Sequence, residues 1–281
     1  MAISLLNNIA PLEAQNQLQG TQNKLQNTLF QLSSGSRINS GADDAAGLAI
    51  ANGLQANVTA LSQSANNAQN GVGALQVSDG ALAQVTTLLN RAVTLATESA
   101  TGTVSNNQRT ALDAEFTQIK AEIDRIGSST TFNGTSVFTA TATNIFLTDA
   151  SSAAANNTIS VTVGALASTS ISYNGTTVSF ASDNLTSSAG AVTTLADINT
   201  AIANVAGIRG TIGAGINRLQ SAVNVISSQV QNLTAAQDQI TAANIPQQVT
   251  NLSEFSILNQ SGISALAQAN SAQQSILKLL Q

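Results

Sequence analysis

Several residue types on which many functional sites depend are missing from this chain. Its 281 residues include no cysteine, no histidine and only two prolines. Without cysteine there is neither a disulfide framework nor a thiolate, and without histidine the usual general base and the commonest metal ligand are absent. The sequence therefore does not predict an enzyme, and we expect no cofactor and no metal site.

Charge is also scarce. Charged residues make up 8% of the chain, the net charge is −5, and about a quarter would be charged in a typical domain. No basic stripe could neutralise phosphates, so nucleic acid is not expected as a partner. The sequence contains no uninterrupted apolar run of membrane-spanning length, so we expect no membrane partner. Its first residues do not form a basic, apolar leader, so we expect no cleaved signal peptide.

Both ends of the chain combine helical spacing with almost no charge. Residues 1–36 and 240–281 place Leu, Ile and Ala at helical intervals among Gln, Asn and Ser. Their only charged residues are Glu13, Lys24, Glu254 and Lys278. A helix with an apolar seam and an uncharged polar back favours many neighbours. We expect these ends to pack into a large assembly, and residues 1–36 and 245–281 to be disordered in the monomer and to fold on assembly.

Two longer segments carry apolar residues at alternating intervals of three and four. The first spans residues 51–96 and is interrupted by Asp79 and Thr86, and the second spans residues 195–233 and is interrupted by Arg209. This spacing is typical of a coiled-coil seam. Because the chain goes out along one segment and returns along the other, the two are expected to pack antiparallel.

A shorter helix is predicted between them, with Ser105 or Asn106 at its start and Gly127 at its end. Its apolar residues follow the same spacing: Leu112, Phe116, Ile119, Ile123 and Ile126. The expected fold is mainly α, a long antiparallel coiled coil or helical bundle built from both chain ends. Lys120 and Asp124 are four residues apart and are expected to pair weakly.

The middle of the chain reads as β structure. Asn174-Gly175 between β-branched runs predicts a two-residue hairpin, Phe132–Thr135 resembles another turn, and a low-complexity linker is the alternative. The expected domains are a terminal helical domain (1–40 with 241–281), a helical bundle (41–135 with 193–240) and a small, surface-exposed β-rich insertion (136–192).

The adjacent acids Asp43 and Asp44 could supply half of a metal site, but no further ligands cluster near them in the sequence. A capping box formed by Ser40 and Asp43 at a helix start is the favoured interpretation. Four glycines on the second seam (Gly207, Gly210, Gly213 and Gly215) are interpreted as sites of close helix contact or a local bend.

The motifs in residues 32–40 (LSSGSRINS) and 43–51 (DDAAGLAIA) closely resemble the amino-terminal signature of bacterial flagellins. Asn217-Arg218-Leu219 and residues 266–280 resemble the carboxy-terminal half of that family. The resemblance covers roughly residues 1–138 and 193–281.

This resemblance implies a structural subunit that polymerises into the flagellar filament, the propeller for swimming, with an inner tube made by the terminal helices. It implies a secreted, extracellular protein and the following partners: further copies in a helical filament, filament cap and junction proteins, a flagellin export chaperone and the type III export apparatus. Two alternatives remain open, a hook–filament junction protein with the same terminal architecture and a secreted coiled-coil adhesin.

Three sets of residues follow. Assembly contacts are expected at Leu18, Leu25, Leu29, Leu32, Leu258, Leu266, Ile276 and Leu280. A joint between inner tube and outer bundle is expected at Ser33, Ser34 and Gly35. By resemblance, Arg91, Leu95 and Glu115 match a patch that a Toll-like innate receptor detects, although Thr94 stands where stimulating members carry Glu.

Overall fold

A computed structural model describes residues 9–139, 143–147 and 158–279. Its helices are α1 (Ile9–Ser34), α2 (Ala45–Ala100), α3 (Asn106–Ser129), α4 (Ser188–Thr241) and α5 (Ile245–Leu279). Its strands are β1 (Thr131–Phe132), β2 (Thr135–Ser136), β3 (Thr143–Phe146), β4 (Thr158–Val161), β5 (Leu166–Ala167), β6 (Ser170–Tyr173) and β7 (Thr176–Val178). The chain forms two compact units, Met1–Ala56 with Asn232–Gln281, and Asn57–Gln231.

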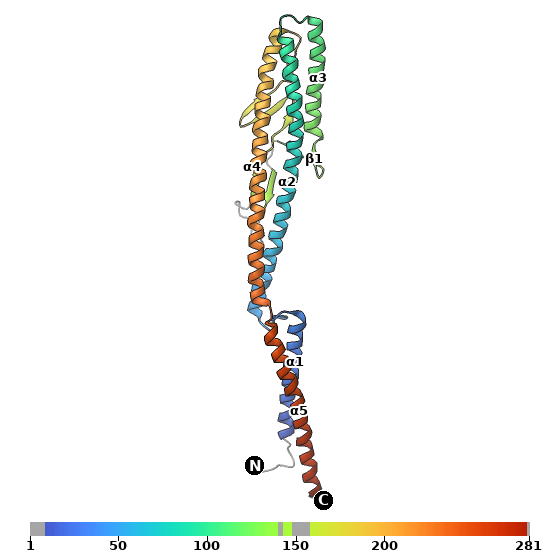
Figure 1. Ribbon diagram of the computed structural model, residues 1–281, viewed down its shortest axis with the longest axis vertical. Coiled ribbons are helices and arrows are strands. Elements are labelled where there is room, and N and C mark those ends of the chain that lie inside the picture. The colour runs from blue at the N-terminus through green and yellow to red at the C-terminus, as the bar shows by residue number, and fades with distance from the viewer. Residues whose placement is uncertain (1–8, 140–142, 148–157, 280–281) are drawn as a thin grey trace. The chain divides into compact units, whose positions relative to one another are not determined.

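In the second unit, α2 and α4 lie side by side and run antiparallel (Figure 1). Each helix carries a series of buried residues that are seven positions apart. On α2 these residues are Leu61, Ala68, Leu75, Leu82, Leu89 and Ala96. On α4 they are Ile198, Val205, Ile212, Leu219 and Ile226. A repeat of seven is the signature of a coiled-coil seam, so the predicted mainly α antiparallel fold is confirmed.

The polar residues that interrupt the two seams meet each other. Arg209 Nε donates to Asp79 Oδ1 at 2.8 Å and Arg209 Nη2 donates to Oδ2 at 3.3 Å. This two-point geometry matches the guanidinium fork to a carboxylate. The second polar interruption of α2, Thr86, bonds within its own helix through Oγ1 to the carbonyl of Leu82 at 2.8 Å.

Helix α3 closes the bundle as a third layer. Ser105 and Gln108 form a capping box at its start, which confirms the first of the two predicted caps. The predicted end at Gly127 is wrong, because the helix continues to Ser129 and Thr130 caps it. Gly127 is buried, and a Cβ there would overlap the carbonyl of Leu166, so this glycine allows β5 to approach the helix.

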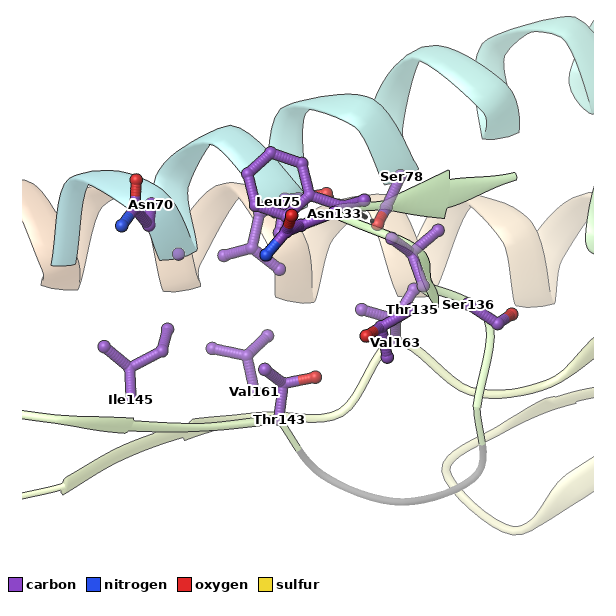
Figure 2. Close-up of a pocket in the computed structure, with 14 residues that line it drawn as sticks. Asn70, Leu75, Ser78, Asn133, Thr135, Ser136, Thr143, Ile145, Val161 and Val163 are labelled. Atoms are coloured by element: carbon purple, nitrogen blue, oxygen red, sulfur yellow. Dashed lines mark hydrogen bonds between the residues drawn. The ribbon is translucent and has the colours of Figure 1, made fainter. Parts of the chain in front are cut away.

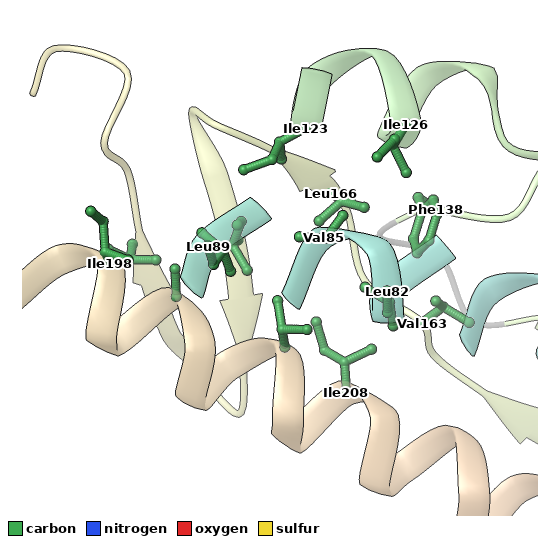
Figure 3. Packing of buried hydrophobic residues seen from close by; sticks show 14 of the residues in the cluster. Leu82, Val85, Leu89, Ile123, Ile126, Phe138, Val163, Leu166, Ile198 and Ile208 are labelled. Atoms are coloured by element: carbon green, nitrogen blue, oxygen red, sulfur yellow. The ribbon is translucent and has the colours of Figure 1, made fainter. Parts of the chain in front are cut away.

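The core of this unit draws on three helices and the strands (Figure 3). Leu82, Val85 and Leu89 from α2 face Ile123 and Ile126 from α3. Ile198 and Ile208 from α4 and Leu166 from β5 complete the cluster. Burial from every side is what makes such side chains stabilising, at roughly 1.5–3 kcal/mol each.

The strands form three small antiparallel sheets, β1-β2, β3-β4 and β5-β6-β7. Both predicted turns are present: Tyr173 pairs with Thr176 around Asn174-Gly175, and Phe132 pairs with Thr135. Asn174 and Gly175 have φ values of 48° and 81°, as a type I′ turn requires. Asn133 and Gly134 repeat this geometry at 50° and 76°.

Side chains of helix α3 hold the β region by bonding to backbone groups of that region. Asp113 accepts from the Leu185 amide at 2.7 Å, and Asp124 accepts from the Ser168 amide at 2.6 Å. Lys120 Nζ donates to the carbonyls of Ala181 and Asp183 at 3.2 and 2.8 Å. The predicted pairing of Lys120 with Asp124 is wrong, since each side chain bonds to the β region instead.

Two seam glycines of α4 also receive side chains from the strands. A Cβ on Gly207 would overlap the Tyr173 ring, and one on Gly215 would lie 2.9 Å from Val161 Cγ2. Gly210 and Gly213 have open space around them. Close helix contact is therefore confirmed only at Gly215, where the added Cβ would also lie 3.3 Å from Leu75 Cδ1 of α2.

By length and composition, α4 is the one helix among the described residues that could cross a membrane. The same test is met by the core helix of a folded bundle, and Ile198, Val205 and Ile212 of α4 are buried in this core. This feature therefore assigns no membrane to the chain.

Candidate assembly interface

Helices α1 and α5 lie side by side and antiparallel in the first unit (Figure 1). Leu18 lies against Gly262, where an added Cβ would be 3.1 Å from Leu18 Cδ1. Nearer the end of α1, Lys24 Nζ lies 5.9 Å from the centroid of the Phe255 ring, a cation–π distance. These contacts use one stripe of each helix and leave the rest uncovered.

A large share of the apolar side chains on these two helices is exposed. The most exposed is Phe30, at 68%, and Ile257 is 64% exposed. We call the following residues the exposed apolar set: Ile9, Leu12, Leu29, Phe30, Ile245, Val249, Ile257, Leu258 and Ile263. Scattered single apolar residues are normal on a surface, but a concentration on one helix pair marks an interaction site.

The polar residues of this pair are neutral almost throughout. Burying a charged group without a partner is costly, whereas a Gln, Asn or Ser side chain can be buried once it is hydrogen-bonded. Many of the hydroxyls already bond within the helix: Thr21 to Gln17 O, Thr28 to Lys24 O, and Ser264 to Gln260 O. The surface is therefore compatible with close packing against further helices.

The predicted assembly residues fall into three groups. Leu18, Leu25, Leu32 and Leu266 are half-buried between or beside the two helices. Leu29 and Leu258 are exposed, both at 47%. The Ile276 side chain and Leu280 lie outside the described residues.

Phe30, Ile257 and Ile263 were missed by the sequence reasoning. Phe30 follows Leu29 and Ile257 precedes Leu258, and both leucines were predicted as assembly contacts. Ile263 follows Gly262, which faces Leu18. Spacing alone does not separate buried from exposed side chains, since Leu29 and Leu258 of the predicted set are exposed as well. A second apolar residue adjacent to a seam position is the signal that could have found them.

The predicted joint lies where α1 ends, at Ser34. Gly35 follows with φ of 69°, in the left-handed region that favours glycine at helix ends. Ser36 then pairs with Ala242 in a short antiparallel bridge. The Arg37 amide donates to Thr241 O at 2.6 Å.

The returning chain breaks at the same level, where a domain boundary was predicted after residue 240 but no joint residues were named. Helix α4 ends at Thr241, and the Ala243 amide donates to Gly35 O at 2.9 Å. Asn244 then starts α5, accepting from the Gln247 amide through its side chain at 3.3 Å. Asn244 followed by Pro246 was the available signal, since this combination favours a helix start.

The acids after the joint order the start of α2. Asp43 Oδ2 accepts from the amides of Asn39 and Ser40 at 3.1 and 2.8 Å, and these bonds lower the pKa of Asp43. The predicted capping box at Ser40 is wrong as a helix start, because Asp44 Oδ1 accepts from the Gly47 amide at 2.8 Å and serves as the cap of α2. Both acids thus order the backbone before and at the start of α2.

The receptor patch implied by the resemblance is split by the structure. Arg91 Nε and Nη2 donate to the two carboxylate oxygens of Glu115 at 2.7 and 3.0 Å. The hydrogen bond from Arg91 lowers the pKa of Glu115. Leu95, in contrast, is fully buried and offers no surface to a receptor in this structure.

A cavity of about 660 Å³ lies between α2 and the strands (Figure 2). Leu75, Ile145, Val161 and Val163 form its apolar wall, and none of the described residues that line it is ionisable. Over residues 9–139, 143–147 and 158–279, no three His, Cys, Asp or Glu side chains gather as metal ligands would.

Comparison with known sequences matches both ends of the chain. Residues 5–143 match the family model for the bacterial flagellin N-terminal helical region, and residues 195–280 match that for the C-terminal helical region. The chain is 41% identical over 134 residues to polar flagellin F of Vibrio parahaemolyticus, covering 48% of this chain and 36% of the relative. It is 39% identical over 165 residues to a flagellin of Salmonella muenchen, covering 59% and 30%. The matched part thus spans about a third of these relatives.

Solved structures also resemble the chain. A structure described as a flagellar hook-associated protein from Vibrio parahaemolyticus matches with a TM-score of 0.56 at 16% identity, over 71% of this chain and 100% of that one. At this identity the match speaks for the fold alone. Bacillus cereus flagellin matches with a TM-score of 0.48 at 33% identity, over 61% and 94% of the two chains.

Proposed function

Because the chain belongs to the bacterial flagellin family, we propose that it is a structural subunit that polymerises into the flagellar filament and so forms the propeller for swimming. The observation that carries this proposal is the exposed apolar set on α1 and α5. Nine large apolar side chains on a nearly uncharged helix pair favour burial against further helices.

The polymer would arise from contacts between unlike surfaces of identical chains. Such head-to-tail contacts produce an open helical filament when the rotation between copies does not close a ring. In this proposal α1 and α5 form the inner domain (1–40 with 241–281), the bundle (41–135 with 193–240) surrounds it, and the β-rich segment (136–192) lies outermost. The assembly residues predicted from the sequence then act together with Phe30, Ile257 and Ile263.

The paired break at Gly35 and Ala242 would serve as the joint between the inner and outer domains. Its hydrogen bonds, Ala243 N to Gly35 O and Arg37 N to Thr241 O, tie the two crossings together. We propose that the two connecting segments of the joint, around Gly35 and around Ala242, move together. A filament could then adopt alternative packings without separating α1 from α5.

The remaining partners follow from this role. A subunit with such exposed apolar ends would need an export chaperone before secretion through the type III apparatus, and cap and junction proteins at the filament ends outside the cell. Recognition by a Toll-like receptor would rest on Arg91 and Glu115, since Leu95 is buried.

Deleting residues 270–281 tests the proposal. This change removes the end of α5 and leaves the bundle residues intact, so polymerisation should be abolished while circular dichroism still shows a folded bundle. Normal filaments from the truncated chain would refute the proposal.

A pair of point variants makes the same test without shortening the chain. Phe30→Ala removes the most exposed side chain of the set, and Val192→Ala is the matched control because Val192 of α4 is 56% exposed in the bundle. Burying Phe30 would contribute about 1.5–3 kcal/mol, so its loss should raise the monomer concentration in equilibrium with filaments about ten- to a hundredfold. Equal effects of the two variants would argue against an interface on α1.

A further inference from the structure

One buried carboxyl oxygen in the second unit lacks a hydrogen bond. Within the part of the chain that the structure describes, Asp183 Oδ2 is a buried side-chain oxygen that no donor reaches. Asp183 lies in the segment between β7 and α4, and this segment packs on α4 where Thr194 Oγ1 donates to the carbonyl of Asn184 at 3.3 Å. Asp197 lies one turn further along α4 and interacts with Asp183. Buried polar atoms are nearly always hydrogen-bonded, so this exception indicates that the ionised pair lacks a hydrogen-bond donor.

The surroundings hold the segment firmly on both sides of Asp183. Phe180 is fully buried, with its ring centroid 6.5 Å from that of Phe116. The Leu185 amide donates to Asp113 of α3. The backbone on both sides of Asp183 is therefore anchored to α3.

The nearby cation does not neutralise this carboxyl by direct pairing. Lys120 of α3 donates to the main-chain carbonyl of Asp183 at 2.8 Å and to that of Ala181 at 3.2 Å. Its Nζ also lies 4.9 Å from the centroid of the Phe116 ring. The charged groups that face Asp183 are thus Asp197 from α4 and Lys120 from α3, with Asp113 of α3 engaged by Leu185.

We propose that Asp183 and Asp197 form a proton-dependent latch, in which one shared proton fixes the segment between β7 and α4 against the helix. An ionised carboxylate is only an acceptor, so two of them cannot bond to each other. A single proton supplies the missing donor and removes one of the two like charges. When both groups are ionised they repel, and the base of the β region is held less tightly.

The electrostatics agree with this geometry. Burial raises the pKa of Asp183, and the charge of Asp197 and its hydrogen bond to the protonated carboxyl raise it further, whereas Lys120 lowers it. A raised carboxyl pKa means that the folded chain binds the proton more tightly than the unfolded chain. The resulting stabilisation is complete below the ordinary Asp value of 3.8 and is lost as pH rises through the raised value.

Thermal unfolding of the full-length monomer tests the latch. Asp183→Asn and Asp197→Asn each remove the repulsion and supply a donor at every pH. Each should raise the Tm at pH 7 by about 2–4 °C, and the gain over the wild type should shrink as pH falls toward the ordinary Asp range. Asp238→Asn removes an exposed charge elsewhere on α4 and controls for the change in net charge.

Three results would overturn the latch: a lower Tm for both variants at pH 7, a gain that is the same at every pH, or an equal gain in Asp238→Asn. A carbon-13 titration of the aspartate carboxyls keeps the test decisive if a variant folds poorly. In the wild-type chain one carboxyl lost in Asp183→Asn spectra should titrate above the ordinary Asp range, and its titration within that range would also refute the proposal.

Discussion

The terminal pair α1–α5 and the bundle α2–α3–α4 are built from the same kind of sequence and reach different degrees of burial. In the bundle, Leu82, Phe116 and Ile198 are almost completely buried. In the terminal pair, Leu29 and Leu258 remain 47% exposed although they belong to the predicted apolar stripe. The bundle has a third helix and strands to cover its seam, whereas in the described residues α1 and α5 pack chiefly against each other.

This difference shows that a heptad pattern specifies a stripe, and that neighbouring layers decide whether the stripe becomes a core. Ordering a residue costs about 1–2 kcal/mol of backbone entropy, and a half-exposed leucine recovers part of that at most. A two-helix pair is therefore weakly stable alone, and further copies would supply the missing layers.

Amide hydrogen exchange on the monomer is the strongest test of the difference in local stability between the terminal pair and the bundle. We expect the amides of α1 and α5 to be protected about a thousandfold less than those around Leu82, because local opening of a poorly buried pair costs little whereas the bundle opens only by global unfolding. Protection at Leu25 or Leu266 comparable to that at Leu82 would show that the terminal pair is stable by itself. The same amides measured in filaments should become protected.

Much of the fold follows from the sequence because it depends on periodic burial and local turn chemistry. The seams, the Ser105 cap and the Asn-Gly turns each need a few neighbouring residues, and all are confirmed. The end of α3, the cap of α2 and the role of Lys120 were predicted incorrectly. Long-range contacts decide two of these: Leu166 packs on Gly127, and carbonyls of the β region capture Lys120.

The candidate interface was predictable in part for the same reason. Seam residues such as Leu18 and Leu25 could be found from spacing, but spacing cannot tell a side chain that packs within the chain from one left for a partner. Phe30 and Ile257 became visible only when the exposed surface was known. The second half of the joint, at Ala242, depends on hydrogen bonding across the chain between its neighbour Ala243 and Gly35.

Two glycine substitutions compare a tightly packed position of the bundle with an open one. Gly127→Ala should destabilise the bundle by about 1–3 kcal/mol, because the added methyl would overlap the Leu166 carbonyl. Gly210→Ala is the matched control in α4, where nothing lies within 4 Å of the added Cβ, and it should stabilise by about 0.4–1 kcal/mol. Denaturant unfolding of the two variants measures both changes, and a destabilising Gly210→Ala would mean that α4 tolerates side chains less well than its open surface indicates.

The smallest expected effect concerns the ion pair that joins the two seams. Asp79 and Arg209 interrupt an apolar pattern, and each side chain is 39% exposed, so solvent screens their attraction. A double-mutant cycle with Asp79→Ala and Arg209→Ala should give a coupling of about 0.2–1 kcal/mol. A value this small would mean that burial of the flanking leucines and isoleucines, and not the ion pair, stabilises the bundle. We predict that the pair instead fixes how α2 and α4 are aligned along each other. Replacing both residues by leucine separates these roles: stability should hold or rise, because apolar residues can replace an ion pair of similar volume, and cross-linking across the helices should then report more than one register. A single register in that variant would show that the apolar seam and the loops suffice to align the helices.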